Sequence, residues 1–102
     1  MDYLADVQKY ADNVDEAVVD KIVKYCGIAL RSKDASTVAA SDQKELDTVK
    51  NGFAKKKLEL SPEDAQAGIE KVCEQMKGVR SKSRVTFYYL LAAATNTMDK
   101  LK

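Results

Sequence analysis

The chain has 102 residues, of which 45% are hydrophobic and 32% are charged, and its 17 Lys/Arg against 16 Asp/Glu leave a formal charge of +1. This composition is too apolar and too evenly charged for a disordered chain, and the length suits a single domain spanning residues 1–102. Because the sequence contains no histidine, it excludes histidine triads, histidine-ligated metal sites and imidazole acid–base catalysis.

The N-terminal segment and the two cysteines indicate a compartment. The first six residues include two acids and lack the basic and apolar stretches of a secretory signal. The longest uncharged run, from Val85 to Met98, has fourteen residues, whereas a membrane-spanning helix needs about 20. Cys26 and Cys73 are far apart in the sequence and are typical of small core residues rather than of a ligand pair. We therefore expect a cytoplasmic protein with no membrane segment, no cofactor and no bound metal.

The N-terminal segment predicts two helices. Its apolar residues fall on one stripe at helical spacing, and they are Leu4, Val7, Ala11, Val14, Val18, Ile22, Tyr25 and Ala29. The stripe alone is compatible with one long helix. Asp12-Asn13 interrupts it with good N-cap residues. We therefore predict one helix to about Ala11 and a second from about Val14 to Cys26, which ends at Gly27.

The middle of the chain predicts a loop followed by a helix. Residues from Arg31 to Thr37 are polar and loop-like, with room for one short turn ending near Val38. Asp42, followed three positions later by Glu45, is typical of a capping box. The helix that it opens runs to about Lys56 and has three apolar residues on one face, Leu46, Val49 and Phe53. A short connector then holds two leucines that are expected to enter the core, Leu58 and Leu60.

The second half of the chain predicts two further helices. Ser61 caps the first of them, Pro62 takes its first helical position, and Gly78 ends it. The last helix runs from about Ser83 to Lys100 and is apolar on nearly all sides from Val85 to Ala94. A helix that is apolar all round is buried all round, so this one is expected at the centre.

Taken together, these elements predict an all-α fold, a compact array of four to six short helices around a central C-terminal helix. No stretch shows the alternation of a β-strand over a useful length. Short connections and unequal helix lengths favour an orthogonal array over a parallel bundle.

Several short motifs resemble those of a known family. They are Cys26-Gly27, Asp34-Ala35 with Val38, Ser41-Asp42 with Glu45-Leu46, Thr48-Val49-Lys50-Asn51 with Phe53, Lys56-Lys57-Leu58 with Leu60, Arg84, and Tyr88-Tyr89-Leu90-Leu91. This series, from Cys26 to Leu91, resembles the small bacterial family catalogued as domain of unknown function 2853. The resemblance implies a bacterial cytoplasmic protein with a helical fold and supplies no functional residue. The sequence departs from the family pattern at Gly52, where an asparagine is expected, and in the basic residues just before Arg84.

The sequence offers no constellation typical of an enzyme. Phosphate-binding glycine loops, paired-cysteine metal spacings and a nucleophile elbow are all absent. The first twenty residues hold six acids and one base, which a solvated helix face explains. A carboxylate metal site built from Asp12, Asp15, Glu16 and Asp20 is an alternative, since three of them share a helix face, but no calcium-loop pattern accompanies it. We predict that the protein is not an enzyme.

Clusters of basic residues define a candidate face for binding phosphate or nucleic acid. Its members are Lys55, Lys56, Lys57, Arg80, Lys82 and Arg84. Lysines near helix C-termini are also expected for a structural reason, because they stabilise the helix dipole. A net charge of +1 is low for a nucleic-acid-binding domain. Nucleic-acid binding is therefore the less favoured explanation.

The last helix also carries a candidate self-association surface, made of Val85, Tyr89 and Ala92. Tyr89 lies on the side opposite to Phe87, where it meets either a second packing helix or a subunit partner. Arg84 is expected to pair with a tyrosine hydroxyl or with an acid of the first helix.

These features predict a non-catalytic helical protein that serves as a protein–protein interaction or structural module and can self-associate, with an unknown protein partner. The alternative is a weak nucleic-acid or phosphate-binding protein that uses the basic face. Self-association depends on protein concentration, whereas nucleic-acid binding depends strongly on salt.

Overall fold

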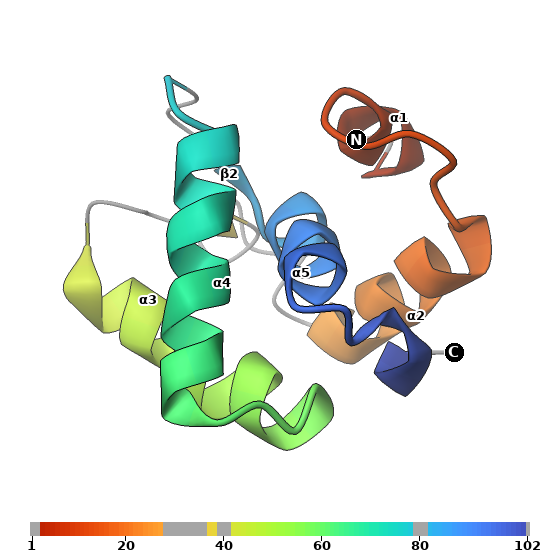
Figure 1. Cartoon of the computed structure of the whole chain (residues 1–102). Helices are drawn as coiled ribbons and strands as arrows, with labels where there is room; N and C mark the ends of the chain where they lie inside the picture. The colour runs from red at the N-terminus through yellow and green to blue at the C-terminus, as the bar shows by residue number, and fades with distance from the viewer. Residues whose placement is uncertain (1–2, 28–36, 39–41, 79–81, 102) are drawn as a thin grey trace.

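The computed structural model describes residues 3–27, 37–38, 42–78 and 82–101, which form a helical array with a very small sheet (Figure 1). In chain order the elements are α1 (Tyr3–Gln8), α2 (Glu16–Cys26), β1 (Thr37–Val38), α3 (Gln43–Val49), the π-helix η2 (Lys50–Lys57), α4 (Pro62–Gln75), β2 (Lys82–Ser83), α5 (Arg84–Ala94) and the 3-10 helix η3 (Met98–Leu101). In Figure 1, α5 lies between α4 on one side and α1 and α2 on the other, and it packs against all three.

The N-terminal segment forms two helices rather than one. Between α1 and α2 the chain passes through Asn13, whose φ of 54° lies in the left-handed region. Asp15 then caps α2 by accepting hydrogen bonds from two backbone N–H groups of the first turn. Gly27 ends α2 with a φ of 47°. The two-helix prediction is confirmed, although the cap lies slightly later than predicted.

α3 and η2 follow each other without a break, and the second of them is wider than an α-helix. Asp42 caps α3 by accepting a hydrogen bond from the Lys44 N–H at 3.0 Å, which confirms the predicted start of the helix. The Glu45 side chain, the second member of the predicted capping box, pairs with Arg84 instead. In the π-helix, hydrogen bonds join residues five apart, as in the 3.1 Å bond from the Leu58 N–H to the Phe53 oxygen. Phe53 and Leu58 therefore lie on one side and both are buried. Leu60 packs against the core. The sequence predicts the end of this helix to within one residue but gives no sign of its widening.

α4 begins as its sequence predicts. The Ser61 hydroxyl accepts a hydrogen bond from the Asp64 N–H at 3.2 Å, and Pro62 occupies the first turn. Four residues on its inner side are buried, Ala65, Gly68, Ile69 and Val72. The helix ends at Gln75, earlier than predicted, and Gly78 follows with a φ of 89°.

Nine consecutive residues of α5 are buried, which makes this helix the centre of the fold. They run from Arg84 to Ala92, and none is more than 8% exposed. In Figure 1, α5 is seen nearly end-on while α4 is seen from the side, so the helices cross instead of forming a parallel bundle. The predicted all-α array around a buried C-terminal helix is confirmed.

α5 is shorter than predicted because the chain turns at Asn96. The Thr97 N–H bonds to the Ala92 oxygen at 2.9 Å, which is the characteristic bond of a Schellman cap. Asn96 has a φ of 57°, a conformation that asparagine tolerates better than most residues. The predicted extension of the helix to Lys100 is therefore wrong. The turn returns the chain to the core, where Leu101 of η3 is 2% exposed.

A two-stranded antiparallel sheet departs from the helix-only expectation. In it, Thr37 lies opposite Ser83 and Val38 lies opposite Lys82. Each strand has two residues, too few for an alternating pattern, so the sequence carries no signal for it. The sheet ties the segment before α3 to the start of α5. Nearly all of the predicted polar loop from Arg31 to Thr37 lies outside the described residues.

Gly68 lies at a close approach of α4 to the end of α5. A Cβ at this position would lie 2.5 Å from Thr95 Cγ2 and 2.7 Å from Leu91 Cδ1. We expect Gly68→Ala to lower the free energy of unfolding by about 1–3 kcal/mol through overpacking. Gly52→Ala is the matched control because a Cβ there meets nothing within 4 Å, and we expect it to stabilise the helix by about 0.5–1 kcal/mol. Urea unfolding measures both changes, and a Gly68→Ala variant as stable as wild type would contradict the packing.

Candidate interaction surface

The six residues of the predicted basic face do not form one open surface. Lys55 to Lys57 are exposed at the end of η2. Lys82 and Arg84 are each 8% exposed. Arg80 lies outside the described residues. The predicted face is therefore wrong for Lys82 and Arg84, because the start of α5 is covered by its neighbours.

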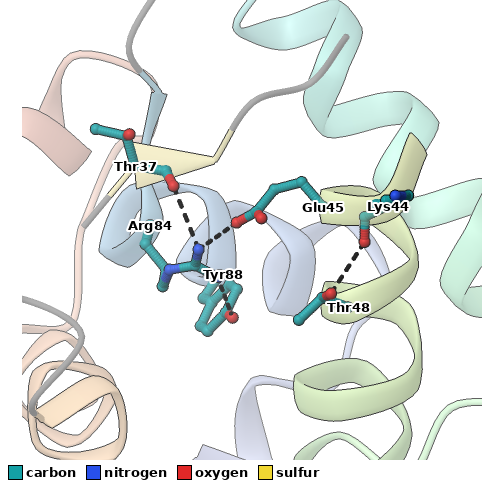
Figure 2. Close-up of polar contacts among 6 residues, drawn as sticks. All are labelled: Thr37, Lys44, Glu45, Thr48, Arg84 and Tyr88. Carbon is teal, nitrogen blue, oxygen red and sulfur yellow. Dashed lines mark hydrogen bonds and ion pairs between the residues drawn. The ribbon is translucent and has the colours of Figure 1, made fainter. Parts of the chain in front are cut away.

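Arg84 joins three parts of the chain from its buried position (Figure 2). Its guanidinium donates hydrogen bonds to the Tyr88 hydroxyl at 2.9 Å and to the Thr37 carbonyl at 3.3 Å, and it forms an ion pair with Glu45. These contacts connect α5 to β1 and α3. The predicted tyrosine partner is confirmed, whereas the acidic partner comes from α3 and not from the first helix.

The surroundings of Arg84 keep it charged and keep Tyr88 protonated. Burial lowers the pKa of Arg84, but its contacts with Tyr88 and Glu45 outweigh burial, so the pKa lies above its ordinary value. Burial raises the pKa of Tyr88, against the opposing effect of the Arg84 charge. A buried cation without such partners is strongly unfavourable. The guanidinium is thus engaged in holding the fold together, which explains why it is not presented to an external anion.

An aromatic cluster connects this buried network to the surface. Phe53 stacks on Tyr88 with ring centroids 4.0 Å apart, and the Tyr25 ring lies tilted at 5.4 Å from Phe53. Tyr25 is 44% exposed, and it is the one large hydrophobic side chain that is exposed in the described part of the chain. Lys57 Nζ lies 5.9 Å from the centroid of the Tyr25 ring. The ends of α2 and η2 therefore meet in a surface that combines an aromatic ring with lysines.

The predicted self-association residues are enclosed within the chain. Val85, Tyr89 and Ala92 are 0%, 4% and 0% exposed. The Tyr89 hydroxyl accepts a hydrogen bond at 3.0 Å from the backbone N–H of Asp15, at the start of α2. Of the two alternatives for Tyr89, the structure shows the packing helix. The predicted subunit contact on this side of α5 is therefore corrected, because α2 already covers it.

The outer face of α4 carries two shallow hollows that sequence reasoning missed. One, of about 260 Å³, lies between α4 and the end of α5, and the other, of about 400 Å³, lies between α4 and the start of η2. Ala67 lines both and is itself exposed. The hollows depend on where η2 and α5 meet α4. The one trace of them in the sequence is Ala67 itself, a small residue among the polar and charged residues of this helix.

The cysteines and acids form no second site within the described ranges. Burial raises the pKa of Cys26 from 9.0 to about 11, against the lowering effect of Arg84, and burial also raises the pKa of Cys73. Both thiols are therefore protonated at neutral pH, which makes them poor nucleophiles. Among the described residues, no three Cys, Asp or Glu side chains are grouped so that they could hold a metal ion. No helix in this part of the chain has the length and apolar character to cross a membrane.

A family model described as a protein of unknown function (DUF2853) matches residues 2–99. The chain belongs to the DUF2853 family. The match confirms the resemblance seen from Cys26 to Leu91 and extends it in both directions. No curated protein matches the chain. DUF2853 membership assigns no activity to the chain.

The Arg84–Glu45 pair provides a test of the buried network. Glu45→Ala leaves a buried cation without its carboxylate, so we expect the free energy of unfolding to fall by about 1.5–3 kcal/mol. Arg84→Met should lower the free energy of unfolding less in the Glu45→Ala variant than in the wild type, because the two side chains interact. Urea unfolding of both single variants and the double variant measures this coupling.

Glu74→Ala is the control for this cycle, since Glu74 is exposed on α4, and we expect a change within about 0.5 kcal/mol. Strict additivity of the Glu45 and Arg84 variants would show that the pair does not stabilise the fold.

Proposed function

We propose that this DUF2853 protein is a non-catalytic protein-interaction module that binds a basic partner on the outer face of α4. The observation that supports the proposal is the pair of hollows on either side of Ala67, along a helix face rich in acidic side chains. Binding through such a face needs no reactive group. In agreement with this, the described residues with shifted pKa values, Cys26, Cys73, Arg84 and Tyr88, line neither hollow.

Helix capping accounts for only part of the acidic character of α4. Glu63 and Asp64 occupy the first turn, where the helix dipole favours acids. Glu70 and Glu74 lie beyond that turn, are exposed, and take part in none of the salt bridges among the described residues. Glu63 and Glu70 both line the larger hollow. A basic partner would therefore meet carboxylates at the rim of a depression.

Phosphate or nucleic-acid binding, the alternative function, has less support from the geometry. Of its six candidate residues, Lys82 and Arg84 are buried. The exposed lysines at 55–57 lie in the last turn of η2, where cations are expected for structural reasons.

The proposal includes a cytoplasmic location. Cys26 and Cys73 are free thiols and not a disulfide, which is typical of a reducing compartment. The bacterial origin that the resemblance implies stays a prediction.

An NMR titration with an amphipathic helical peptide rich in lysine and leucine tests the proposed surface. We expect the amide signals of α4 around Ala67 to shift at low salt. Ala67→Gln fills the space between the hollows and should weaken binding about tenfold. Glu16→Gln is the control, because Glu16 is an exposed acid on α2, and it should leave the affinity unchanged. Shifts spread evenly over all acidic surfaces, or equal losses in both variants, would contradict the proposal.

A further inference from the structure

We infer that the partner of the α4 face is a second copy of this chain, which contributes Tyr25 and the lysines at the end of η2. The inference rests on the proposed function, because it uses the same face of α4. In this arrangement the Tyr25 ring of one copy enters the larger hollow of the other. Lys55 and Lys56 of the first copy then meet Glu63 and Glu70 at the rim.

Tyr25 has the properties of an interface anchor. It is 44% exposed, yet its ring is held by contacts with Phe53 at 5.4 Å and with Tyr88 at 6.4 Å. A ring that is already held in place loses little conformational freedom on binding, and tyrosine is enriched at the energetic centres of interfaces. Lys57 Nζ lies 5.9 Å from the ring centroid, so positive charge accompanies the anchor.

The larger hollow on α4 complements this anchor in size and charge. It has a volume of about 400 Å³ and is lined by Lys50, Pro62, Glu63, Gln66, Ala67 and Glu70. Pro62 and Ala67 offer apolar surface to an aromatic ring, while Glu63 and Glu70 offer carboxylates to lysines. An anchor in a depression with a charged rim is the usual arrangement of a specific protein interface.

The two complementary surfaces lie on neighbouring elements, which suits a two-fold symmetric dimer. α4 packs against η2, and only Leu58 to Ser61 separate them in the chain. A two-fold axis between copies therefore places the anchor of each against the hollow of the other, so that the contact is made twice. The formal charge of +1 leaves little net repulsion between copies.

Sedimentation equilibrium over a concentration series tests the inference on the full chain. We expect the wild type to dimerise at high micromolar concentration in low salt and to dissociate as salt is added. The variant Lys55→Glu/Lys56→Glu has acids on both halves of the contact, and Glu63→Lys/Glu70→Lys has bases on both halves. Each variant alone should dimerise at least about tenfold more weakly than wild type, whereas an equimolar mixture of the two should associate again.

Asp12→Lys/Glu16→Lys is the matched control for Glu63→Lys/Glu70→Lys, because it makes the same change in net charge at exposed positions away from the contact. It should leave dimerisation unchanged. Thermal unfolding identifies any variant that fails to fold, and Lys55→Gln/Lys56→Gln and Glu63→Gln/Glu70→Gln are the milder substitutes. Recovery in the mixture cannot arise from a folding defect, because neither component alone would then regain structure.

A wild-type chain that stays monomeric at every concentration, or a mixture that associates no better than its components, overturns the inference. If the wild type is monomeric while the basic peptide still binds α4, the second-copy inference fails and the proposed function stands. If the peptide does not bind either, both fail. Binding of a single-stranded oligonucleotide at Tyr25 by a strictly monomeric chain also overturns it, in favour of a nucleic-acid surface.

Discussion

Burial of α5 on every side is the constraint on which the rest of the structure depends. Its middle residues are apolar all round, so one neighbouring helix cannot shield them from water. α4, α2 and α1 pack against different sides of it, and the short helices that do so must be joined by sharp turns. Asn13, between α1 and α2, and Asn96, between α5 and η3, have φ values of 54° and 57° and occupy such turns. The turns and the crossing of the helices therefore follow from the need to enclose one apolar helix.

Polar groups on α5 determine which element covers which side. Arg84 pairs with Glu45 of α3, the Thr86 hydroxyl donates to the Asp6 carboxylate of α1, and the Tyr89 hydroxyl accepts from the backbone before α2. Apolar contacts alone are not directional, whereas a buried polar group left without its partner is costly. Within the described residues, the Ser83 hydroxyl is the one buried side-chain oxygen or nitrogen without a partner. The polar contacts thus favour this arrangement of helices over others that bury the same area.

Local signals in the sequence predict the helices well, whereas contacts between distant parts of the chain cannot be recognised from it. Ser61, Asp42 and Gly27 act within a few residues of themselves, so their capping roles can be recognised from sequence. The acidic partner of Arg84, Glu45, lies 39 residues away, and β1 pairs with a segment that is still more distant in the chain, so neither contact follows from spacing. Asn96 did carry a local signal, but the long apolar run before it concealed the end of the helix.

The candidate site was harder to predict because residue type does not reveal exposure. From sequence, Arg84 is compatible with an open basic face or with a tyrosine partner, and Tyr89 with a subunit contact or with a packing helix. In the structure both are buried by elements from other parts of the chain. Tyr25 belongs to the apolar stripe of the second predicted helix, yet its side chain is 44% exposed in the structure. The exposed surfaces that can serve an interaction role therefore lie on α4, α2 and η2 and not on α5.

Native-state hydrogen exchange measured by NMR tests the central position of α5 most directly. The account predicts that the amides from Tyr88 to Ala92 exchange slowest, at rates set by global unfolding, while those of α1 and η3 exchange faster through local opening. If the α5 amides exchanged as fast as those of α1, the helix would not be the enclosed centre of the fold, and the account would be contradicted.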